Sequence, residues 1–194
     1  MGDSITEGQY IGAPHRWVDI VSNHFGGGVV QFFHSGVSGD TSRQGLERFP
    51  KAVQILEPSI VFIQFGHNDC NFWATDNGCP RVSLTAFEEN LKEMFKRSIL
   101  HGAQDVFYIA PHPTLIDQTF DSETSYEDSR RDYVLAMERV AEELSCPLID
   151  PSHEFLGYDL SDLLLLDNIH LSTVGHQVYS DMVIGFLTPF LSSH

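Results

Sequence analysis

Short hydrophobic runs alternate along the chain with segments in which hydrophobic residues recur every three or four positions. The clearest run is 59–66 (SIVFIQFG), which is nearly continuous in apolar residues and therefore predicts a buried strand. The clearest periodic segment is 84–100, where residues such as Leu84, Phe87 and Leu91 share one helical face. The same patterns predict strands at 29–35, 105–112 and 147–152, and helices at 15–25, 41–56 with a break near Pro50, 125–144, and from Ser172 to about Pro189.

This alternation of strands and helices predicts the fold class. Strands separated by helices imply right-handed crossovers and a parallel sheet that is covered by helices on both faces. In such a sheet the side chains that carry out chemistry gather at the carboxyl ends of the strands. We therefore expect an α/β protein with a single domain over residues 1–194 and a site at that edge of the sheet.

Composition and charge exclude some functions. No hydrophobic run approaches the ~18 residues that would cross a membrane, so we expect no stable membrane insertion. The net charge of −16 opposes binding to nucleic acids and anionic membranes, which would repel the chain. The first eight residues show no signal-peptide pattern, so we expect a cytoplasmic protein, with secretion left open if an upstream segment is missing.

Cysteines and histidines give no sign of a metal site. Cys70, Cys79 and Cys146 form an odd set without CxxC spacing, which indicates neither a zinc site nor a disulfide framework, although a Cys70–Cys79 pair stays open. The histidines lack a compact ligand spacing such as HxxxH. His67 and His112 follow predicted strands and are candidates for lining a pocket. The sequence thus implies no metal and no cofactor.

Four polar clusters stand out against this background. A lone serine, glycine, asparagine or histidine is usually structural, as a helix cap, a turn residue or a packed side chain. Four clusters that together supply one chemistry favour a functional interpretation. They are GDS at 2–4, SGVSGD at 35–40, GHND at 66–69 and DNIH at 167–170.

The clusters contain every group that serine hydrolysis requires. That chemistry needs a hydroxyl, an imidazole that takes its proton, a carboxylate that orients the imidazole, and donors for an oxyanion. Ser4 supplies the hydroxyl, and Asp167 stands three residues before His170, a spacing at which a turn lets the carboxylate reach one ring nitrogen. The N–H of Gly39 and the side-chain amide of Asn68 suit an oxyanion hole.

In order and spacing, GDSITEG, GVSGDTS, GHND and DNIH resemble the four blocks of the GDSL esterase/lipase family, also called SGNH hydrolases. The resemblance spans nearly the whole chain. It implies a three-layer, flavodoxin-like fold with Ser4 as nucleophile, His170 as base and Asp167 as its orienting acid. It also implies an oxyanion hole formed by the N–H groups of Ser4 and Gly39 and the side chain of Asn68. The chain contains no G-x-S-x-G, so the α/β-hydrolase elbow does not apply.

The resemblance also predicts a buried strand directly before Gly2, where only Met1 stands. A strand of ~5 buried apolar residues at ~1.5–3 kcal/mol each matches the whole net stability of a domain, about 5–15 kcal/mol. We expect this first strand to be missing or truncated and Ser4 to lie on a frayed terminus. A start site assigned too late is the favoured explanation. A rearranged sheet, or a strand supplied by a partner or a neighbouring protomer, are the alternatives.

These observations predict a serine esterase that hydrolyses carboxylic esters through an acyl-enzyme on Ser4. We expect short-chain or acetyl esters, including those on carbohydrate, as small-molecule substrates. Two alternatives stay open: a non-catalytic or weakly active sugar- or acyl-binding protein, because of the missing strand, and an acyltransferase that uses the same triad. The loops that would contact substrate, at 67–83, 112–124 and 153–166, carry no readable code.

Overall fold

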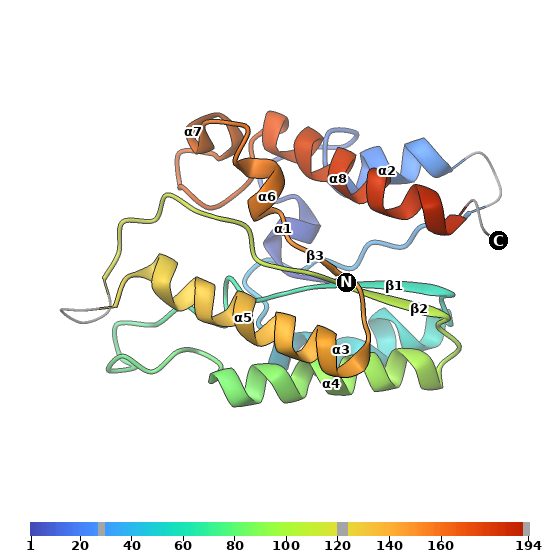
Figure 1. Cartoon of the computed structure of the whole chain (residues 1–194), viewed down its shortest axis with the longest axis horizontal. Coiled ribbons are helices and arrows are strands. Elements are labelled where there is room, and N and C mark those ends of the chain that lie inside the picture. Colours follow the sequence, from blue (N-terminus) through green and yellow to red (C-terminus); the bar gives the residue numbers. More distant parts are fainter. Residues whose placement is uncertain (27–29, 120–123, 192–194) are drawn as a thin grey trace.

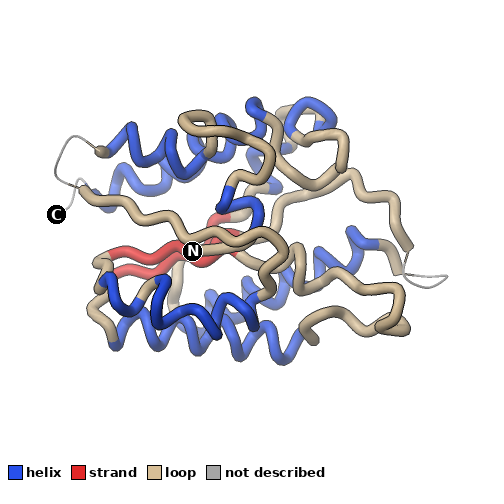
Figure 2. Tube along the Cα trace, turned by 180° about the vertical axis from the view of Figure 1, so that it is seen from behind, coloured by secondary structure: helices blue, strands red, loops and turns tan. Residues whose placement is uncertain are grey.

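A parallel sheet lies between two layers of helices, and the N-terminus sits at the centre of the sheet layer (Figures 1 and 2). This computed structural model describes residues 1–26, 30–119 and 124–191. The predicted parallel α/β architecture is confirmed. The described strands follow the order β1-β2-β3, all parallel: β1 (Ile60–Gln64), β2 (Asp105–Ile109) and β3 (Leu148–Ile149).

Helices cover both faces of the sheet. Figure 1 shows α3, α4 and α5 on one face and α2, α6, α7 and α8 on the other. The bounds are α1 (Ser4–Glu7), α2 (Trp17–Phe25), α3 (Ser42–Ala52), η1 (Gln54–Leu56), α4 (Leu84–Leu100), α5 (Tyr126–Leu144), α6 (Ser152–Phe155), α7 (Leu160–Leu163) and α8 (Thr173–Leu191).

The continuous hydrophobic run of β1 follows from burial on both faces. Val61 and Ile63 pack into the cluster beneath α3, α4 and α5, whereas Ile60 and Phe62 pack toward α2 and α8. Neighbouring β2 divides in the same way along its length. A strand with two buried faces has no polar side to alternate with, so the sequence shows a run rather than a period of two.

Helix boundaries agree with the sequence where capping residues fix them. Thr41 and Ser125 each form a reciprocal capping box, and Ser83 caps the start of α4. The break predicted near Pro50 falls at Val53, between the end of α3 and the start of η1. One prediction was wrong: the stretch 153–166, expected to be irregular, contains most of α6 and all of α7.

The strand predicted at 29–35 does not form. Residue 29 lies outside the described residues, and residues 30–35 belong to no strand. A cavity of about 490 Å³ lies between this segment and β1, and its lining includes Phe32, Phe33, Ile60 and Phe62. The physical reason is the missing neighbour: a hydrophobic segment becomes a strand only where another backbone pairs with it.

Met1 and Gly2 lie at one end of that gap, where Gly2 forms parallel bridges to Gly36 and Gln64. Gly2 donates to the carbonyl of Ser35 at 3.1 Å, and its own carbonyl accepts from Val37 at 3.1 Å. On the other side the Met1 carbonyl accepts from Gln64 at 3.0 Å, and the Met1 amino group donates to the carbonyl of Phe62 at 2.7 Å. The expectation that Ser4 follows a frayed terminus was therefore wrong, because Met1 and Gly2 are paired on both sides.

Burial changes the chemistry of the amino terminus itself. Met1 is only 9% exposed. Burial, together with the charge of Arg48, lowers the pKa of its amino group to about 5. The amine is therefore neutral at pH 7 and bonds to β1 as a backbone amide would. In a strand the N–H and C=O of one residue point to the same side, and successive residues alternate between the two sides. The N–H of Phe62 and both backbone groups of Ile60 therefore also face the gap.

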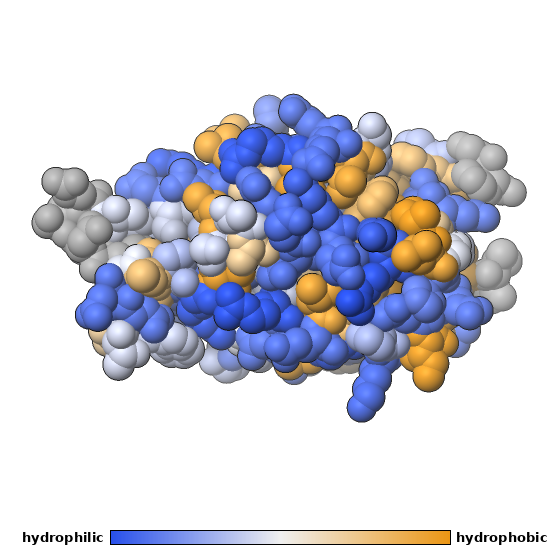
Figure 3. Space-filling view, turned by 90° about the horizontal axis from the view of Figure 1, so that it is seen from below, coloured by the Kyte–Doolittle hydropathy of each residue, from blue (hydrophilic) through white to orange (hydrophobic). Residues whose placement is uncertain are grey.

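The face over α3, α4 and α5 is mostly hydrophilic, with more hydrophobic residues toward one side of the view (Figure 3). Of the helices within the described residues, none combines the length and apolar character needed to span a bilayer.

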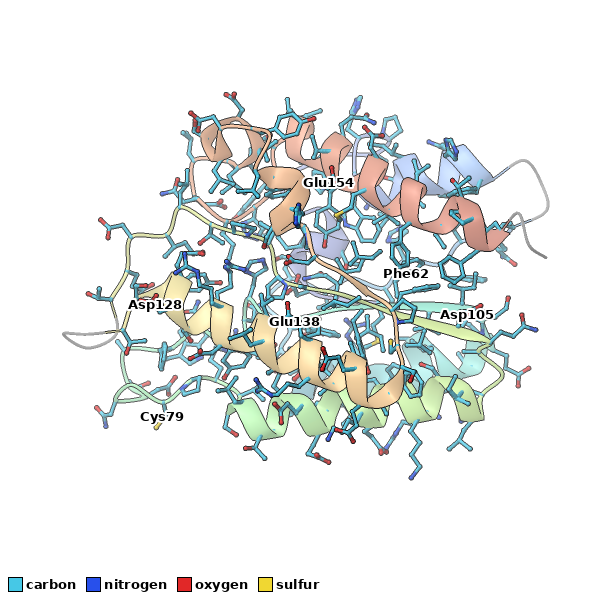
Figure 4. All side chains as sticks on the ribbon, viewed as in Figure 1. Phe62, Cys79, Asp105, Asp128, Glu138 and Glu154 are labelled. Carbon is cyan, nitrogen blue, oxygen red and sulfur yellow. The ribbon has the colours of Figure 1, made fainter. Side chains whose placement is uncertain are left out.

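The Cys70–Cys79 pair that the sequence left open does not form. Cys70 is buried and Cys79 exposed, neither in a disulfide, and Figure 4 shows Cys79 at the edge of the molecule.

Filling the gap beside Met1 should stabilise the fold. An extension of about five apolar residues before Met1 can pair with β1 and fill the 490 Å³ cavity. After the cost of ordering the chain, we expect the free energy of unfolding to rise by a few kcal/mol, measured by urea denaturation. A Gly/Ser extension of equal length is the control. Equal stability of the two extended proteins would contradict this account of the gap.

Candidate active site

Three predicted site residues meet in one chain of hydrogen bonds. Ser4 Oγ lies 2.9 Å from Nε2 of His170, although 166 positions separate the two residues. The Nδ1 of the same ring lies 2.7 Å from Oδ2 of Asp167. When Nδ1–H donates to the carboxylate, Nε2 is free to accept the Ser4 proton. The arrangement is that of a hydroxyl, a base and an orienting acid.

Ser4 is positioned by the helix that it begins. It is the first residue of α1, and the Oδ1 of Asp3 caps this helix by accepting from the N–H of Ile5 at 2.9 Å. Two bonds anchor the helix: the indole of Trp17 donates to the carbonyl of Ile5 at 2.9 Å, and Thr6 donates to Oε1 of Gln64 at 2.8 Å. The first cluster therefore serves both purposes: Asp3 caps a helix, and Ser4 lies beside His170.

His170 is held by the loop between α7 and α8. Oδ1 of Asp167 accepts from the backbone N–H of His170 at 3.0 Å and of Ile169 at 3.2 Å, and Leu165 donates to the carbonyl of His170 at 2.7 Å. Partial burial opposes ionisation of Asp167, but the hydrogen bonds from the backbone and ring of His170 outweigh it and lower the pKa of the carboxyl. Asp167 is therefore a carboxylate at neutral pH.

The Gly39 loop lies against α1. A Cβ on Gly36 would come within 2.1 Å of the N of Glu7, so only glycine allows this approach. Oε2 of Glu7 accepts from the backbone N–H of Ser38 at 2.6 Å and from its hydroxyl. Gly39 itself has a φ of 81°, a left-handed conformation that favours glycine.

Asn68 lies next to the same loop. Its Nδ2 donates to the carbonyl of Asp40 at 3.1 Å, which leaves the second N–H of the amide for another acceptor. Asp69, which follows it, is buried and accepts from the backbone N–H of Ser42 at 2.9 Å and from its hydroxyl. The two predicted oxyanion residues are thus neighbours, held between the starts of α1 and α3.

Sequence reasoning missed Arg48, which joins the clusters. Its guanidinium donates to the carbonyl of Gly2 at 2.8 Å, to the carbonyl of Ser35 at 3.1 Å and to the carboxylate of Asp40. The available signal was its place on α3, three residues after the buried Gly45. A basic residue beside a buried helical face usually has a fixed partner.

Tyr10 was also missed. Its ring meets the His170 ring edge to face, with centroids 5.3 Å apart and planes at 86°, and the side chain is 71% exposed. It therefore forms an outer wall of the site. Nothing in the hydrophobic pattern indicates this contact, because Tyr10 stands in a turn outside any periodic segment.

His67 and His112 support the site from within the core instead of lining an open pocket. Both are buried, and Nε2 of His67 lies 3.2 Å from Nδ1 of His112. The Nε2 of His112 lies 2.8 Å from the carbonyl of Ile169, the neighbour of His170. Burial lowers the pKa of His112 to about 3 and that of His67 well below its usual value, so both rings are neutral.

In the described part of the chain no three His, Cys, Asp or Glu side chains are grouped as metal ligands.

A sequence profile of the GDSL-like lipase/acylhydrolase family matches residues 1–178. The chain belongs to this family. Two curated relatives are the lipoprotein YqeF of Bacillus subtilis, 33% identical over 54% of this chain, and thioesterase 1/protease 1/lysophospholipase L1 of Escherichia coli, 30% identical over 60%. The matches cover 44% and 48% of those proteins, so the chain spans about half the length of these relatives.

Solved structures share the fold of this family member. The acetylxylan esterase Axe2 of Geobacillus stearothermophilus superposes with a TM-score of 0.77 at 19% identity, over 94% of this chain and 90% of that one. A likeness at this identity concerns the fold. It supports the three-layer, flavodoxin-like fold that the family resemblance implied.

Asp3 should make stability depend on pH. Burial raises its pKa to about 7, and the charges of Asp69 and Asp40 add to this, although the bond from Ile5 opposes it. Because this value exceeds the unfolded one of ~3.9, the stabilising contribution is complete below about pH 4 and is lost as pH rises through about 7. Asp3→Asn keeps the capping oxygen but does not titrate.

We expect the stability of Asp3→Asn relative to the unmodified protein to rise between about pH 4 and 7, by roughly 1 kcal/mol per pH unit. Urea denaturation across this range measures it. Asp117→Asn, which removes an exposed carboxylate, corrects for the change in net charge. A difference that does not vary with pH would show that Asp3 ionises in the folded protein as it does in the unfolded chain.

Proposed function

We propose that this protein is a serine esterase that hydrolyses carboxylic esters through an acyl-enzyme on Ser4. The observation that carries the proposal is the hydrogen-bond chain from Asp167 through His170 to Ser4. Family membership supports it, because esterase and thioesterase are the activities named for relatives of this chain. The residues of the site then take the following roles.

Ser4 Oγ attacks the ester carbonyl while its proton passes to Nε2 of His170. Asp167 stabilises the imidazolium that forms. The carbonyl oxygen, now negative, accepts hydrogen bonds from the N–H groups of Ser4 and Gly39 and from the Asn68 amide. As the first residue of α1, Ser4 has an N–H without an acceptor inside its own helix, which suits this role.

The alcohol leaves when the C–O ester bond breaks and His170 returns the proton to it. Water then attacks the acyl group on Ser4, and His170 accepts the water proton and passes it back to Ser4 Oγ. Each half of the reaction uses the same base and the same three donors. The acid product is released and the starting state is restored.

Short acyl groups are the substrates that the site favours. The 490 Å³ cavity is lined by neither Ser4 nor His170, and the same holds for a groove of about 330 Å³ near Trp73. The acyl group is therefore received at the surface between Tyr10 and the Gly39 loop. Such a site fits acetyl or other short esters.

A second candidate is a weakly active or non-catalytic binding protein of this fold. The observation in its favour is the cavity beside Met1, since a nucleophile held by a two-residue strand depends on few backbone bonds. A displacement of ~1 Å can cost about 100-fold in rate. Reactivity of the serine separates this candidate from the esterase.

A fluorophosphonate probe should label Ser4, because only a serine activated by a base reacts with it. We expect stoichiometric labelling, located by peptide mass spectrometry, and none in Ser4→Ala. Ser59→Ala removes an exposed serine as the control and should label normally. A folded protein that takes up no probe at Ser4 would favour the binding protein.

The p-nitrophenyl esters from acetate to palmitate test the substrate class. We expect turnover to be highest with the acetate and to fall with chain length, because neither the 490 Å³ cavity nor the 330 Å³ groove is lined by Ser4 or His170. Rates are compared under conditions that keep every ester below its micelle concentration. A rate that rises toward palmitate would be incompatible with a short-chain site.

A further inference from the structure

Arg81 lies beside both proposed oxyanion residues, although it stands 13 positions after Asn68. The loop between them closes on itself: Val82 donates to the carbonyl of Asp69 at 3.2 Å, and Arg81 donates to the carbonyl of Asn71 at 2.9 Å. These two bonds return the chain to the point where the loop began. The guanidinium is thereby brought next to Asn68.

The guanidinium bridges two oxygens. Nη1 donates to Oδ1 of Asn68 at 3.1 Å, and Nη2 donates to the carbonyl of Gly39 at 3.0 Å. The Cζ of Arg81 lies 5.1 Å from the centre of the Trp73 ring, and Trp73 is 61% exposed. None of the ion pairs among the described residues includes Arg81. Its charge therefore stays close to the proposed oxyanion donors and forms no close ion pair, although it also acts on the buried carboxyl of Asp69, whose pKa is raised by burial and lowered in part by Arg81.

This contact, together with the bond from Nδ2 to the carbonyl of Asp40, fixes which way the Asn68 amide faces. The oxygen and nitrogen of an asparagine side chain are nearly equal in size, so rotation by 180° costs little unless hydrogen bonds distinguish them. A guanidinium has only donors, so Oδ1 faces Arg81, and Nδ2 faces the carbonyl of Asp40 with its second N–H left for another acceptor. A bond from a charged donor also polarises the amide, which makes its N–H a stronger donor.

The second contact restrains the glycine. Gly39 has no side chain to limit rotation of its backbone, and its φ of 81° is one of several conformations that a glycine can adopt. Holding its carbonyl fixes one end of this residue, while the bonds of Ser38 to Glu7 fix the other. One side chain, at the far end of the loop that follows Asn68, thus contacts both proposed donor residues.

We propose that Arg81 is a positioning residue of the oxyanion hole: it orients the Asn68 amide and holds the Gly39 loop so that both donors face the ester oxygen. The inference rests on the proposed esterase function. Arg81 touches no reacting atom and acts through Asn68 and Gly39. Its loss should therefore reduce kcat and leave KM for a small ester nearly unchanged, because the oxyanion forms only as Ser4 attacks and is absent from the bound ester.

The first experiment compares variants by steady-state hydrolysis of p-nitrophenyl acetate. Arg81→Ala should lower kcat by about 10- to 100-fold with KM within about twofold. Arg81→Lys should not restore it, since an ammonium group cannot bridge the two oxygens in the planar geometry of a guanidinium. Arg43→Ala is the matched control: Arg43 lines the same groove, and its loss should leave kcat unchanged.

Rescue by added guanidinium ion distinguishes a positioning role of Arg81 from a merely structural one. It should restore part of the kcat of Arg81→Ala in a saturable manner and should not affect Arg43→Ala. Arg81→Gln, which keeps the length of the side chain, serves if Arg81→Ala does not fold. Thermal unfolding of every variant confirms that each is folded at the assay temperature.

A double-mutant cycle separates this inference from the function on which it rests. Asn68→Ala should lower kcat by about 10²–10³-fold, and adding Arg81→Ala should cost little more, because both changes remove one function. Unaltered turnover in Asn68→Ala would overturn the oxyanion role itself. A loss in Asn68→Ala without a loss in Arg81→Ala, additive losses, or no rescue by guanidinium would overturn the role of Arg81 alone.

Discussion

The pairing of Met1 and Gly2 with the backbone on either side fixes the position of the amino end, including Ser4. Met1 and Gly2 bond to the segment at 35–37 and to β1, and Arg48 also binds the carbonyl of Gly2. Ser4 follows after a single capping residue, so its position is set by this pairing and by the anchors of α1. The same bonds hold the Gly39 loop beside Ser4, because Gly2 and that loop are hydrogen-bonded neighbours. A short remnant of a strand thus aligns the hydroxyl with the proposed oxyanion donors.

The carboxyl end of the chain completes the site through a different kind of support. The loop with Asp167 and His170 is closed by its own backbone bonds, and the buried pair His67 and His112 supports it through the carbonyl of Ile169. Both rings of this pair are kept neutral by burial. The loop is therefore braced from the core by uncharged groups, which leaves Asp167 as the carboxylate that holds the ring of His170 in place.

Sequence patterns predicted those features that a short segment determines by itself. Helix α4 was predicted with its observed bounds because its hydrophobic face and its cap at Ser83 are both local, and the four polar clusters were visible as residue types and order. The strand at 29–35 was predicted wrongly because strand formation depends on a neighbour, and among the described residues the only backbone hydrogen bond to this segment comes from Gly2, at Ser35. Arg81 and Tyr10 escaped for a related reason: loop closure, and not periodicity, brings them to the site.

The most direct test of the whole arrangement is a crystal structure of the protein after reaction with a small fluorophosphonate. The phosphonyl oxygen then stands where the oxyanion would form. The account predicts phosphorus bound to Ser4 Oγ, with that oxygen about 2.7–3.1 Å from the N–H of Gly39 and from Nδ2 of Asn68. An adduct whose oxygen faces away from both donors, or one formed on a different residue, would contradict it.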